Sequence, residues 1–271
     1  MAVGLRGVIY PCRSKTMQFH EKVVVITGAG RGIGYALAEA FTEEGARVVI
    51  AEINPETGAA AAQKLSAHFT QVDVSSAPAV KQAVNEVVKT HGRIDVWINN
   101  AGIAHKGMAV DLEPEDWDAD IGVMLSGAFY CARYAGEVML RQGSGSMVNI
   151  ASVNGLFAQK ARAPYCSAKA GLIMLTKVLA SEWGAQGVRV NAVAPGIFMT
   201  ELVQQGIDQG IVKKETYFSR IPMGRMGEMN ELIEAVKFLA GDEASFVTGE
   251  VLRVDGGWTA YHLFYPFEEA F

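Results

Sequence analysis

The sequence predicts an α/β protein with a doubly wound parallel sheet that is covered by helices on both faces. Short apolar runs rich in β-branched residues alternate along the chain with longer segments of helical character. Because parallel strands are joined by crossover helices, this order favours a parallel sheet. The chain has 271 residues, which suffices for a sizeable core, and we expect residues 17–271 to form a single domain.

The expected elements follow one another from the first apolar run onwards. Strands are expected at residues 23–27, 46–52, 69–73, 94–98, 146–151, 187–193 and 250–254. Helices are expected at residues 32–44, 55–66, 77–91, 115–142, 163–184 and 228–241. Sheets of this kind bind ligands at the carboxyl ends of their strands, so the segments that follow the strands form the candidate site.

A glycine-rich loop joins the first strand to the first helix. It follows the β-branched run at residues 24–26 and leads into an alanine-rich segment. Glycine admits positive φ and lets a phosphate approach the backbone, while the start of a helix offers N–H groups and a positive dipole end. This context is typical of a dinucleotide site of the Rossmann type. The expected cofactor contacts in the loop are Gly28, Arg31, Gly32, Ile33 and Gly34.

The second apolar run, at residues 48–51, ends at Glu52, about twenty residues beyond the glycine loop. A carboxylate at this place can accept hydrogen bonds from ribose hydroxyls, and it repels a 2′-phosphate. Arg31 is the opposing signal, because its guanidinium could reach a 2′-phosphate. Since Ile53 adds no basic charge, we expect NAD rather than NADP as the cofactor.

Tyr165 and Lys169 stand four residues apart in a predicted helix, so their side chains lie on one face. A tyrosine exchanges protons poorly at neutral pH because its reference pKa is about 10. A neighbouring cation favours the phenolate, so we expect Lys169 to lower the pKa of Tyr165 and make it a general acid/base. Ser152, just after the strand at 146–151, strengthens this interpretation.

Together these residues resemble the short-chain dehydrogenase/reductase family. The resemblance extends over nearly the whole chain, and its motifs occur in the family's order. They are the loop at 27–34, Asp73-Val74, Asn-Asn-Ala-Gly at 99–102, the set Ser152, Tyr165 and Lys169, the Pro-Gly segment at 195–200, and Val-Asp-Gly-Gly at 254–257.

The resemblance implies an oxidoreductase that transfers a hydride between NAD and a carbonyl or secondary alcohol, such as a polyol or sugar. It implies that Tyr165 exchanges the hydroxyl proton, that Ser152 positions the substrate oxygen, and that Lys169 binds the nicotinamide ribose. The further cofactor contacts that it implies are Asp73, Val74, Asn100, Ala101, Gly102, Tyr165, Lys169, Pro195, Gly196, Ile197 and Thr200. The family commonly forms homotetramers, and in it the segment that corresponds to 195–226 sets substrate specificity.

One position departs from the family pattern. Met124 stands where the family usually has an asparagine that supports a proton relay. A thioether cannot donate a hydrogen bond as an amide can, although the backbone carbonyl survives the change. Ser126 and Asn154 are the nearby polar residues that could compensate, and Met124 could equally be a core residue.

The composition excludes several classes of partner. The net charge is −5 and there is no basic patch, so nucleic acid is not expected. No apolar run reaches the ~20 residues of a membrane span. Cys12, Cys131 and Cys166 are scattered, which fits a reducing compartment, and we expect a cytoplasmic protein without a metal site. His105 could edge the active site, although a place in a surface loop is the simpler interpretation.

The chain ends and the function leave alternatives open. We expect residues 1–16 to be a disordered leader that precedes a natural start at Met17. The aromatic tail at 261–267 fits a subunit interface or packing within one subunit. An NADPH-dependent reductase of ketones or 3-oxoacyl thioesters is the first alternative function. A nucleotide-binding protein without catalysis, suggested by Met124, is the second.

Overall fold

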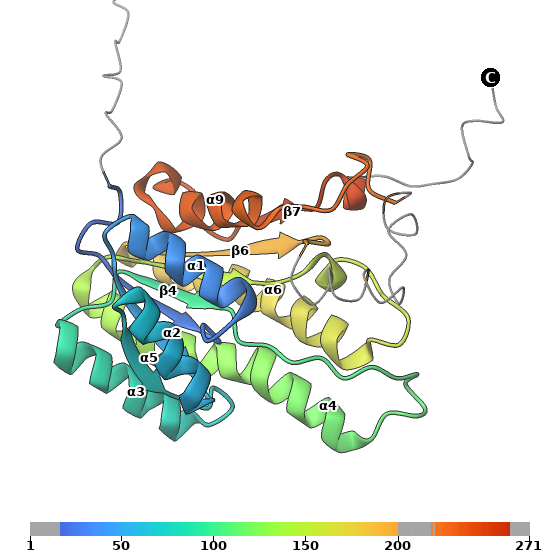
Figure 1. The fold of residues 1–271 in the computed structure, drawn as a ribbon, viewed down its shortest axis with the longest axis horizontal. Coiled ribbons are helices and arrows are strands. Elements are labelled where there is room, and N and C mark those ends of the chain that lie inside the picture. The colour runs from blue at the N-terminus through green and yellow to red at the C-terminus, as the bar shows by residue number, and fades with distance from the viewer. Residues whose placement is uncertain (1–16, 200–206, 208–217, 219, 261–271) are drawn as a thin grey trace, which may run out of the picture.

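The computed structural model describes residues 17–199, 207, 218 and 220–260. Seven parallel strands form one sheet in the order β3-β2-β1-β4-β5-β6-β7. The strand order reverses between β1 and β4, which is the mark of a doubly wound sheet. Figure 1 shows the sheet behind α1 and α2, with the arrows of β6 and β7 pointing in the same direction. The predicted fold class is confirmed.

The first half of the sheet alternates strand and helix without interruption. Its elements are β1 (Val23–Thr27), α1 (Gly32–Glu43), β2 (Arg47–Glu52), α2 (Pro55–Leu65), β3 (His68–Gln71), α3 (Ala77–His91) and β4 (Val96–Asn99). Side chains cap two of the helices: Asn54 accepts from backbone N–H groups of α2, and Ser76 accepts from one of α3. A proline follows each cap in the first turn, where its missing N–H costs no hydrogen bond.

The second half contains longer helices. Its elements are α4 (Pro114–Ile121), a π-helical turn (Gly122–Ser126), α5 (Gly127–Gln142), β5 (Gly145–Ile150), a 3₁₀ turn (Val153–Gly155), α6 (Ala163–Trp183), β6 (Val188–Pro195), α9 (Met229–Ala240) and β7 (Val251–Val254). Shorter 3₁₀ turns follow at Gly184–Gln186, Asp242–Ala244 and Trp258–Ala260. The predicted strand and helix limits agree with these to within two residues.

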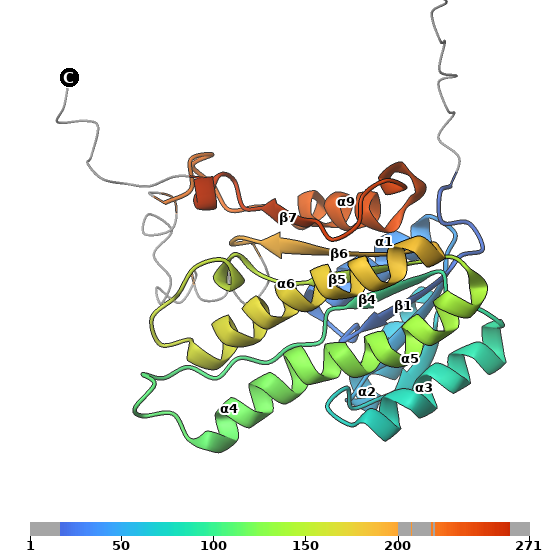
Figure 2. The same ribbon diagram turned by 180° about the vertical axis from the view of Figure 1, so that it is seen from behind.

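Helices cover both faces of the sheet. One core cluster packs α1, α2 and α9 against the sheet, through residues such as Phe41, Leu65 and Leu232. A second cluster packs α3, α5 and α6 against the other face, through residues such as Val84 and Met139. Figure 1 looks onto the first face and Figure 2 onto the second. Because both faces are covered, the strands are apolar almost throughout.

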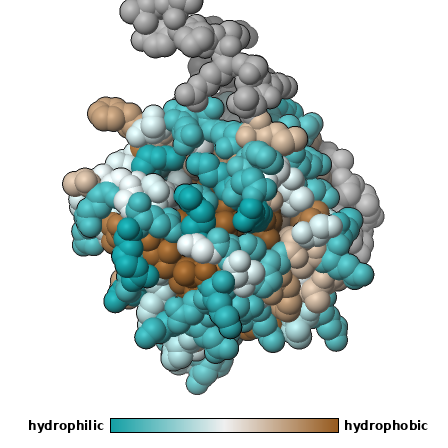
Figure 3. All heavy atoms as spheres, turned by 90° about the vertical axis from the view of Figure 1, so that its left-hand side faces the viewer, coloured by the Kyte–Doolittle hydropathy of each residue, from teal (hydrophilic) through white to brown (hydrophobic). Residues whose placement is uncertain are grey.

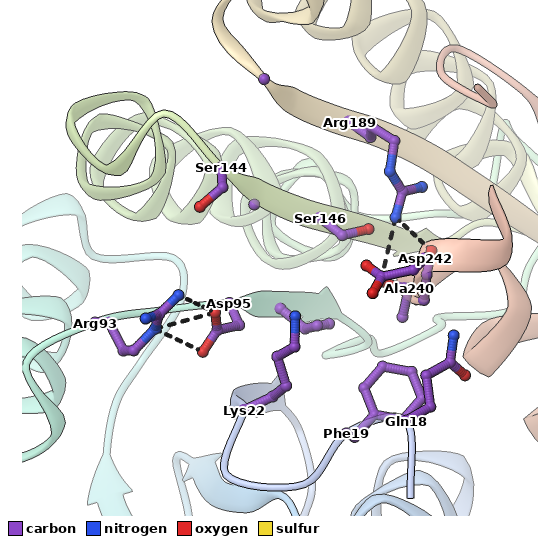
Figure 4. A pocket seen from close by; sticks show the side chains of 14 residues that line it. Gln18, Phe19, Lys22, Arg93, Asp95, Ser144, Ser146, Arg189, Ala240 and Asp242 are labelled. Carbon is purple, nitrogen blue, oxygen red and sulfur yellow. Dashed lines mark hydrogen bonds and ion pairs between the residues drawn. The ribbon is translucent and has the colours of Figure 1, made fainter. Parts of the chain in front are cut away.

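The amino ends of the strands border a cavity of about 170 Å³. Figure 3 views the molecule from this edge and shows hydrophobic surface in a hollow ringed by hydrophilic side chains. Two arginine side chains that line the cavity are bound by other residues of the chain (Figure 4). Arg93 forms an ion pair with Asp95 at 2.6 Å, and Arg189 donates to the carbonyls of Ala240 and Gly241 just after α9. The Arg189 hydrogen bonds join the end of α9 to the sheet at the edge opposite the candidate site.

Several expectations concern residues beyond the described part. The expected leader at 1–16, the aromatic tail at 261–267 and most of the segment at 200–219 lie outside the described residues. Within the described residues, no helix is long and apolar enough to cross a membrane.

Candidate active site

A cleft of about 620 Å³ opens at the carboxyl ends of the central strands. Most of the cofactor contacts expected from the sequence meet in it. The predicted residues that line it are Gly28, Arg31, Ile33, Glu52, Asp73, Val74, Asn100, Ala101 and Gly102. Residues that the sequence did not indicate line it as well, among them Ser75, Ile103 and Asp118. The cleft thus joins the loops that follow β1, β2, β3 and β4.

Thr27 and Asn100 fasten the first loop of the cleft to the fourth strand. The Thr27 hydroxyl accepts hydrogen bonds from the backbone N–H of Asn100 at 3.0 Å and of Ala101 at 3.1 Å. The Asn100 amide donates in return to the carbonyls of Thr27 and Gly28. Thr27 is fully buried, so these bonds are shielded from water. Asn100 therefore acts first as a support for the loop.

The glycine loop has the space that a dinucleotide phosphate needs. Gly32 has φ of +60° at the start of α1, and a Cβ placed there would meet no other atom within 4 Å. Gly28 also has positive φ, and its Cβ would lie 2.9 Å from the Cα of Ala101. A backbone that is open at Gly32 and close-packed at Gly28 fits a pyrophosphate at the helix start.

Glu52 binds the glycine loop directly. Its carboxylate accepts hydrogen bonds from the backbone N–H of Gly30 at 3.1 Å, of Ile53 at 3.0 Å and of Asn54 at 3.2 Å. A carboxylate has about four lone-pair sites, so it retains capacity for ribose hydroxyls. The residue thus has a structural role in the loop in addition to its expected role toward the cofactor.

Ser152, Tyr165 and Lys169 come together beside the end of β5. Ser152 begins the 3₁₀ turn after the strand, and its Oγ accepts from the Asn154 N–H at 3.1 Å. A Cβ at Gly155 would lie 2.8 Å from the backbone of Lys169, so this turn packs directly on α6. Lys169 Nζ lies 5.7 Å from the centroid of the Tyr165 ring. The three side chains therefore share one small region, as their motif predicts.

The pKa of Tyr165 contradicts the sequence prediction. Burial raises the pKa of the Tyr165 phenol, and the opposing effects of a hydrogen bond with Ser152 and of the Arg162 charge do not overcome it. Lys169 is not among the groups that offset this rise in the pKa of Tyr165, and its Nζ donates a hydrogen bond to the Ile150 carbonyl at 2.6 Å. Burial also lowers the pKa of Lys169 itself to about 8. The prediction that Lys169 brings the Tyr165 pKa down was wrong for this arrangement.

Met124 lies in the π-helical turn at Gly122–Ser126 and is buried. Its side chain packs on the loop after β4, where a Cβ at Gly102 would lie 3.5 Å from Met124 Cγ. Met124 and Lys169 line the same internal cavity of about 10 Å³, which is close to the space that one water molecule needs. Met124 is thus a core residue, as the simpler interpretation of this position has it, and it also lies beside Lys169.

His105 contacts a buried carboxylate on α4. Its ring Nδ1 lies 2.8 Å from Asp120 Oδ1, its backbone N–H lies 3.2 Å from Asp120 Oδ2, and Asp120 is fully buried. This hydrogen bond raises the pKa of His105. The contact ties the loop after β4, which lines the cleft, to α4. The contact between His105 and Asp120 could not be predicted from sequence spacing, because the two residues are 15 positions apart and lie in different elements.

Three of the four contacts expected in the Pro-Gly segment lie in the described structure. Pro195 ends β6, and the Gly196 N–H donates to the Val254 carbonyl at 2.8 Å. Ile197 lines a smaller cavity of about 200 Å³ next to β7. Thr200 lies outside the described residues. The structure therefore places the Pro-Gly segment at the carboxyl edge but leaves its end undescribed.

Comparison with known proteins agrees with this geometry. The family model for enoyl-(acyl carrier protein) reductase matches residues 28–259. The chain is 39% identical over 246 residues to a 3-oxoacyl-[acyl-carrier-protein] reductase of Thermotoga maritima, covering 89% of this chain and 99% of the relative. It is 40% identical over 247 residues to a meso-2,3-butanediol dehydrogenase of Serratia marcescens, covering 90% of this chain and 97% of the relative.

The solved structures include a close match in fold. A gluconate 5-dehydrogenase from Burkholderia cenocepacia, crystallised with NADP and tartrate, superposes with a TM-score of 0.85 at 36% identity. The match covers 91% of this chain and 98% of that one. The cleft and the cluster of Ser152, Tyr165 and Lys169 agree with these similarities, which extend along almost the whole length of the chain. The chain belongs to the short-chain dehydrogenase/reductase family of oxidoreductases.

Proposed function

We propose that this oxidoreductase transfers a hydride between NAD and a small secondary alcohol or its ketone, of the polyol, sugar or hydroxy-compound class. The observation that carries the proposal is the meeting of Ser152, Tyr165 and Lys169 beside a cleft with a glycine loop and Glu52. The relatives that act on butanediol, threitol and glycerol support this class of substrate. A screen of diols, polyols and hydroxy acids with NAD, followed by NADH absorbance, tests it.

The proposed roles follow from the chemistry of each side chain. The bound nicotinamide accepts or supplies the hydride. Tyr165, whose raised pKa keeps the phenol protonated at neutral pH, donates its proton to the ketone oxygen in reduction. Ser152 holds that oxygen by a hydrogen bond. Lys169, with a pKa of about 8, is mostly an ammonium at neutral pH and can bind ribose hydroxyls.

We propose NAD as the preferred cofactor because of Glu52. Replacing Glu52 with alanine removes a carboxylate that repels a 2′-phosphate and that holds the Gly30 N–H at 3.1 Å. We expect the KM for NAD to rise about tenfold or more, because hydrogen bonds to charged groups contribute ~1.5–3 kcal/mol. The relative use of NADP should rise at the same time.

Glu43→Ala is the matched control, since Glu43 is an exposed carboxylate at the end of α1. It should leave the ratio of NAD to NADP turnover unchanged. A wild-type enzyme that already prefers NADP would contradict the proposal and favour Arg31, which lines the same cleft. That outcome would support the alternative of an NADPH-dependent ketone or 3-oxoacyl thioester reductase, the class of the Thermotoga maritima relative.

Met124→Asn tests whether a side-chain amide is needed near Lys169. The two residues line one internal cavity of about 10 Å³, and the backbone carbonyl of residue 124 is the same in both variants. We therefore expect kcat at saturating NAD to change by less than about threefold across the pH range, which is ~0.7 kcal/mol of barrier. A tenfold gain would mean that the missing amide limits proton transfer.

We propose that the enzyme is a cytoplasmic homotetramer. Exposed apolar side chains gather on α5 and α6, where Phe129 is 46%, Met174 58% and Val178 43% exposed. Figure 2 shows these two helices side by side on one face of the molecule. An interface between copies would remove this surface from water. Light scattering of the purified chain measures the mass of the assembly.

A further inference from the structure

Arg162 is a charged side chain next to the proposed acid/base that the catalytic roles do not use. It is the residue that precedes α6, three positions before Tyr165. Its guanidinium carbon lies 5.8 Å from the centroid of the Tyr165 ring, and Lys169 Nζ lies 5.7 Å from the same centroid. Two cations therefore stand around the phenol, one buried at the end of β5 and the other only partly buried.

The Arg162 charge has no carboxylate partner among the described residues. The arginines Arg93, Arg133, Arg141 and Arg225 each form an ion pair with a carboxylate in that same part of the chain. Arg162 also stands at the start of a helix of 21 residues, whose N-terminal N–H groups favour an anion. Because no described carboxylate pairs with it, a guanidinium in this position can bind an oxyanion group of a ligand.

The backbone holds Arg162 beside a second basic segment. Gly107 forms a bridge with Arg162, and the Gly107 N–H donates to the Ala161 carbonyl at 3.2 Å. Lys106 and Lys160 are exposed neighbours in these two paired segments. Lys106, Lys160 and Arg162 thus lie on two segments that pair with each other. Exposed cationic side chains attract and orient anionic ligands.

The contact of His105 with Asp120 keeps this arrangement in place. His105 lies two residues before Gly107, and its ring is fixed at 2.8 Å from the buried Asp120 carboxylate. The segment that carries Lys106 is therefore anchored on α4 at one side and on the segment of Arg162 at the other. These two anchors hold the backbone of the segment that carries Lys106 beside the segment of Arg162.

We propose that Arg162 is a specificity-determining residue that binds an oxyanion group of the substrate, so that the preferred substrate is an anionic hydroxy or oxo compound. The inference rests on the proposed function, because it places the anion next to the carbon that Tyr165 serves. Carboxylates and phosphates share the chemistry that a guanidinium recognises. Lys106 and Lys160 attract the anion, and Arg162 makes the direct contact.

The test compares substrates that differ in charge but not in the reacting group. One pair is 3-hydroxybutanoate and butane-2,3-diol, and the other is glycerol 3-phosphate and glycerol. We expect the wild-type enzyme to have the higher kcat/KM for the anionic member of at least one pair. The pair that shows this preference identifies the recognised group as a carboxylate or a phosphate. Arg162→Gln should lower kcat/KM for that anion about 10–100-fold more than for its neutral partner, since charge-assisted contacts contribute ~1.5–3 kcal/mol.

Two further variants separate charge from structure. Arg162→Lys should restore part of the preference, because an ammonium keeps the charge but loses the planar fork. Lys177→Gln, an exposed lysine further along α6, is the matched control and should leave the preference unchanged. An equal loss for the charged and neutral members in Arg162→Gln would overturn the inference, as would a wild-type enzyme with no preference for either anion.

Binding measurements keep the inference separate from the proposed function. Absence of turnover with every substrate and both nucleotides would reject the proposed function. In that case the affinity of the NAD-loaded protein for 3-hydroxybutanoate and for glycerol 3-phosphate, measured by calorimetry, still decides the role of Arg162. Binding of either anion that Arg162→Gln weakens supports the inference, and binding that the variant leaves unchanged, or no binding at all, rejects it.

Discussion

Tyr165→Phe is expected to lower kcat by about 10²–10⁴-fold, the usual contribution of a general acid/base. The change removes the phenol and keeps the ring, which lies between Arg162 and Lys169 at 5.8 and 5.7 Å. Nucleotide affinity should remain near that of the wild type, because Tyr165 does not line the cleft of the glycine loop. Steady-state kinetics and NADH fluorescence titration measure the two quantities.

The pH dependence adds a second signature of the same residue. Because burial raises the pKa of Tyr165, the phenol remains protonated well above neutral pH. At saturating NADH, where loss of the Lys169 charge does not limit cofactor binding, kcat for ketone reduction should therefore stay constant through neutral pH and fall as the phenol ionises. Alcohol oxidation should rise over that same range, because only the phenolate accepts a proton. Tyr134→Phe removes a hydroxyl on α5 and should behave as wild type. Near-normal kcat in Tyr165→Phe would rule out the assigned role.

Gly34→Ala is expected to reduce NAD affinity at least about 100-fold, which is ~2.7 kcal/mol. A Cβ at Gly34 would collide with the Gly28 carbonyl oxygen and with the Asn100 amide, and it would lie 2.9 Å from the Cα of Ala29. Two of these three are backbone atoms of the glycine loop, so the loop itself must move. Overpacking of this kind also lowers the free energy of unfolding by about 1–3 kcal/mol.

Gly184→Ala is the matched control for this substitution. Its Cβ would meet nothing closer than 4.0 Å, and its backbone has helical φ and ψ of −56° and −42°. Nucleotide titration and thermal unfolding of both variants separate a local collision from a general effect of alanine. Wild-type affinity in Gly34→Ala would show that the loop tolerates the shift and that its packing on Asn100 does not shape the cofactor site.

The fold could be predicted from the sequence because its signals are local. The β-branched run at 23–27 and the apolar run ending at Glu52 mark strands by composition alone, and the strand–loop–helix order fixes the edge that binds ligand. The π-helical turn at Gly122–Ser126 was not predicted, since one hydrogen-bond register within a long helix leaves no pattern in the sequence.

The electrostatics of the site could not be predicted in the same way. The sign of the Tyr165 pKa shift depends on how deeply the phenol is buried, and burial is decided by elements distant in the chain. Asp120 reads as one more acid in a polar segment, and only the packing of α4 makes it a buried partner of His105. The sequence places Arg162 three residues before Tyr165. Only the three-dimensional structure shows that no carboxylate among the described residues pairs with it.

The buried Lys169 also has a thermodynamic consequence for the whole protein. Its pKa falls from 10.5 to about 8 on folding, so between these values the unfolded chain binds a proton that the folded chain has released. By proton linkage, the contribution of Lys169 to the free energy of unfolding increases as the pH rises from about 8 to 10.5. Below pH 8 the residue is a buried ammonium and destabilises the folded state. At neutral pH the buried Lys169 ammonium therefore lowers the free energy of unfolding. The apolar clusters on both faces of the sheet offset it.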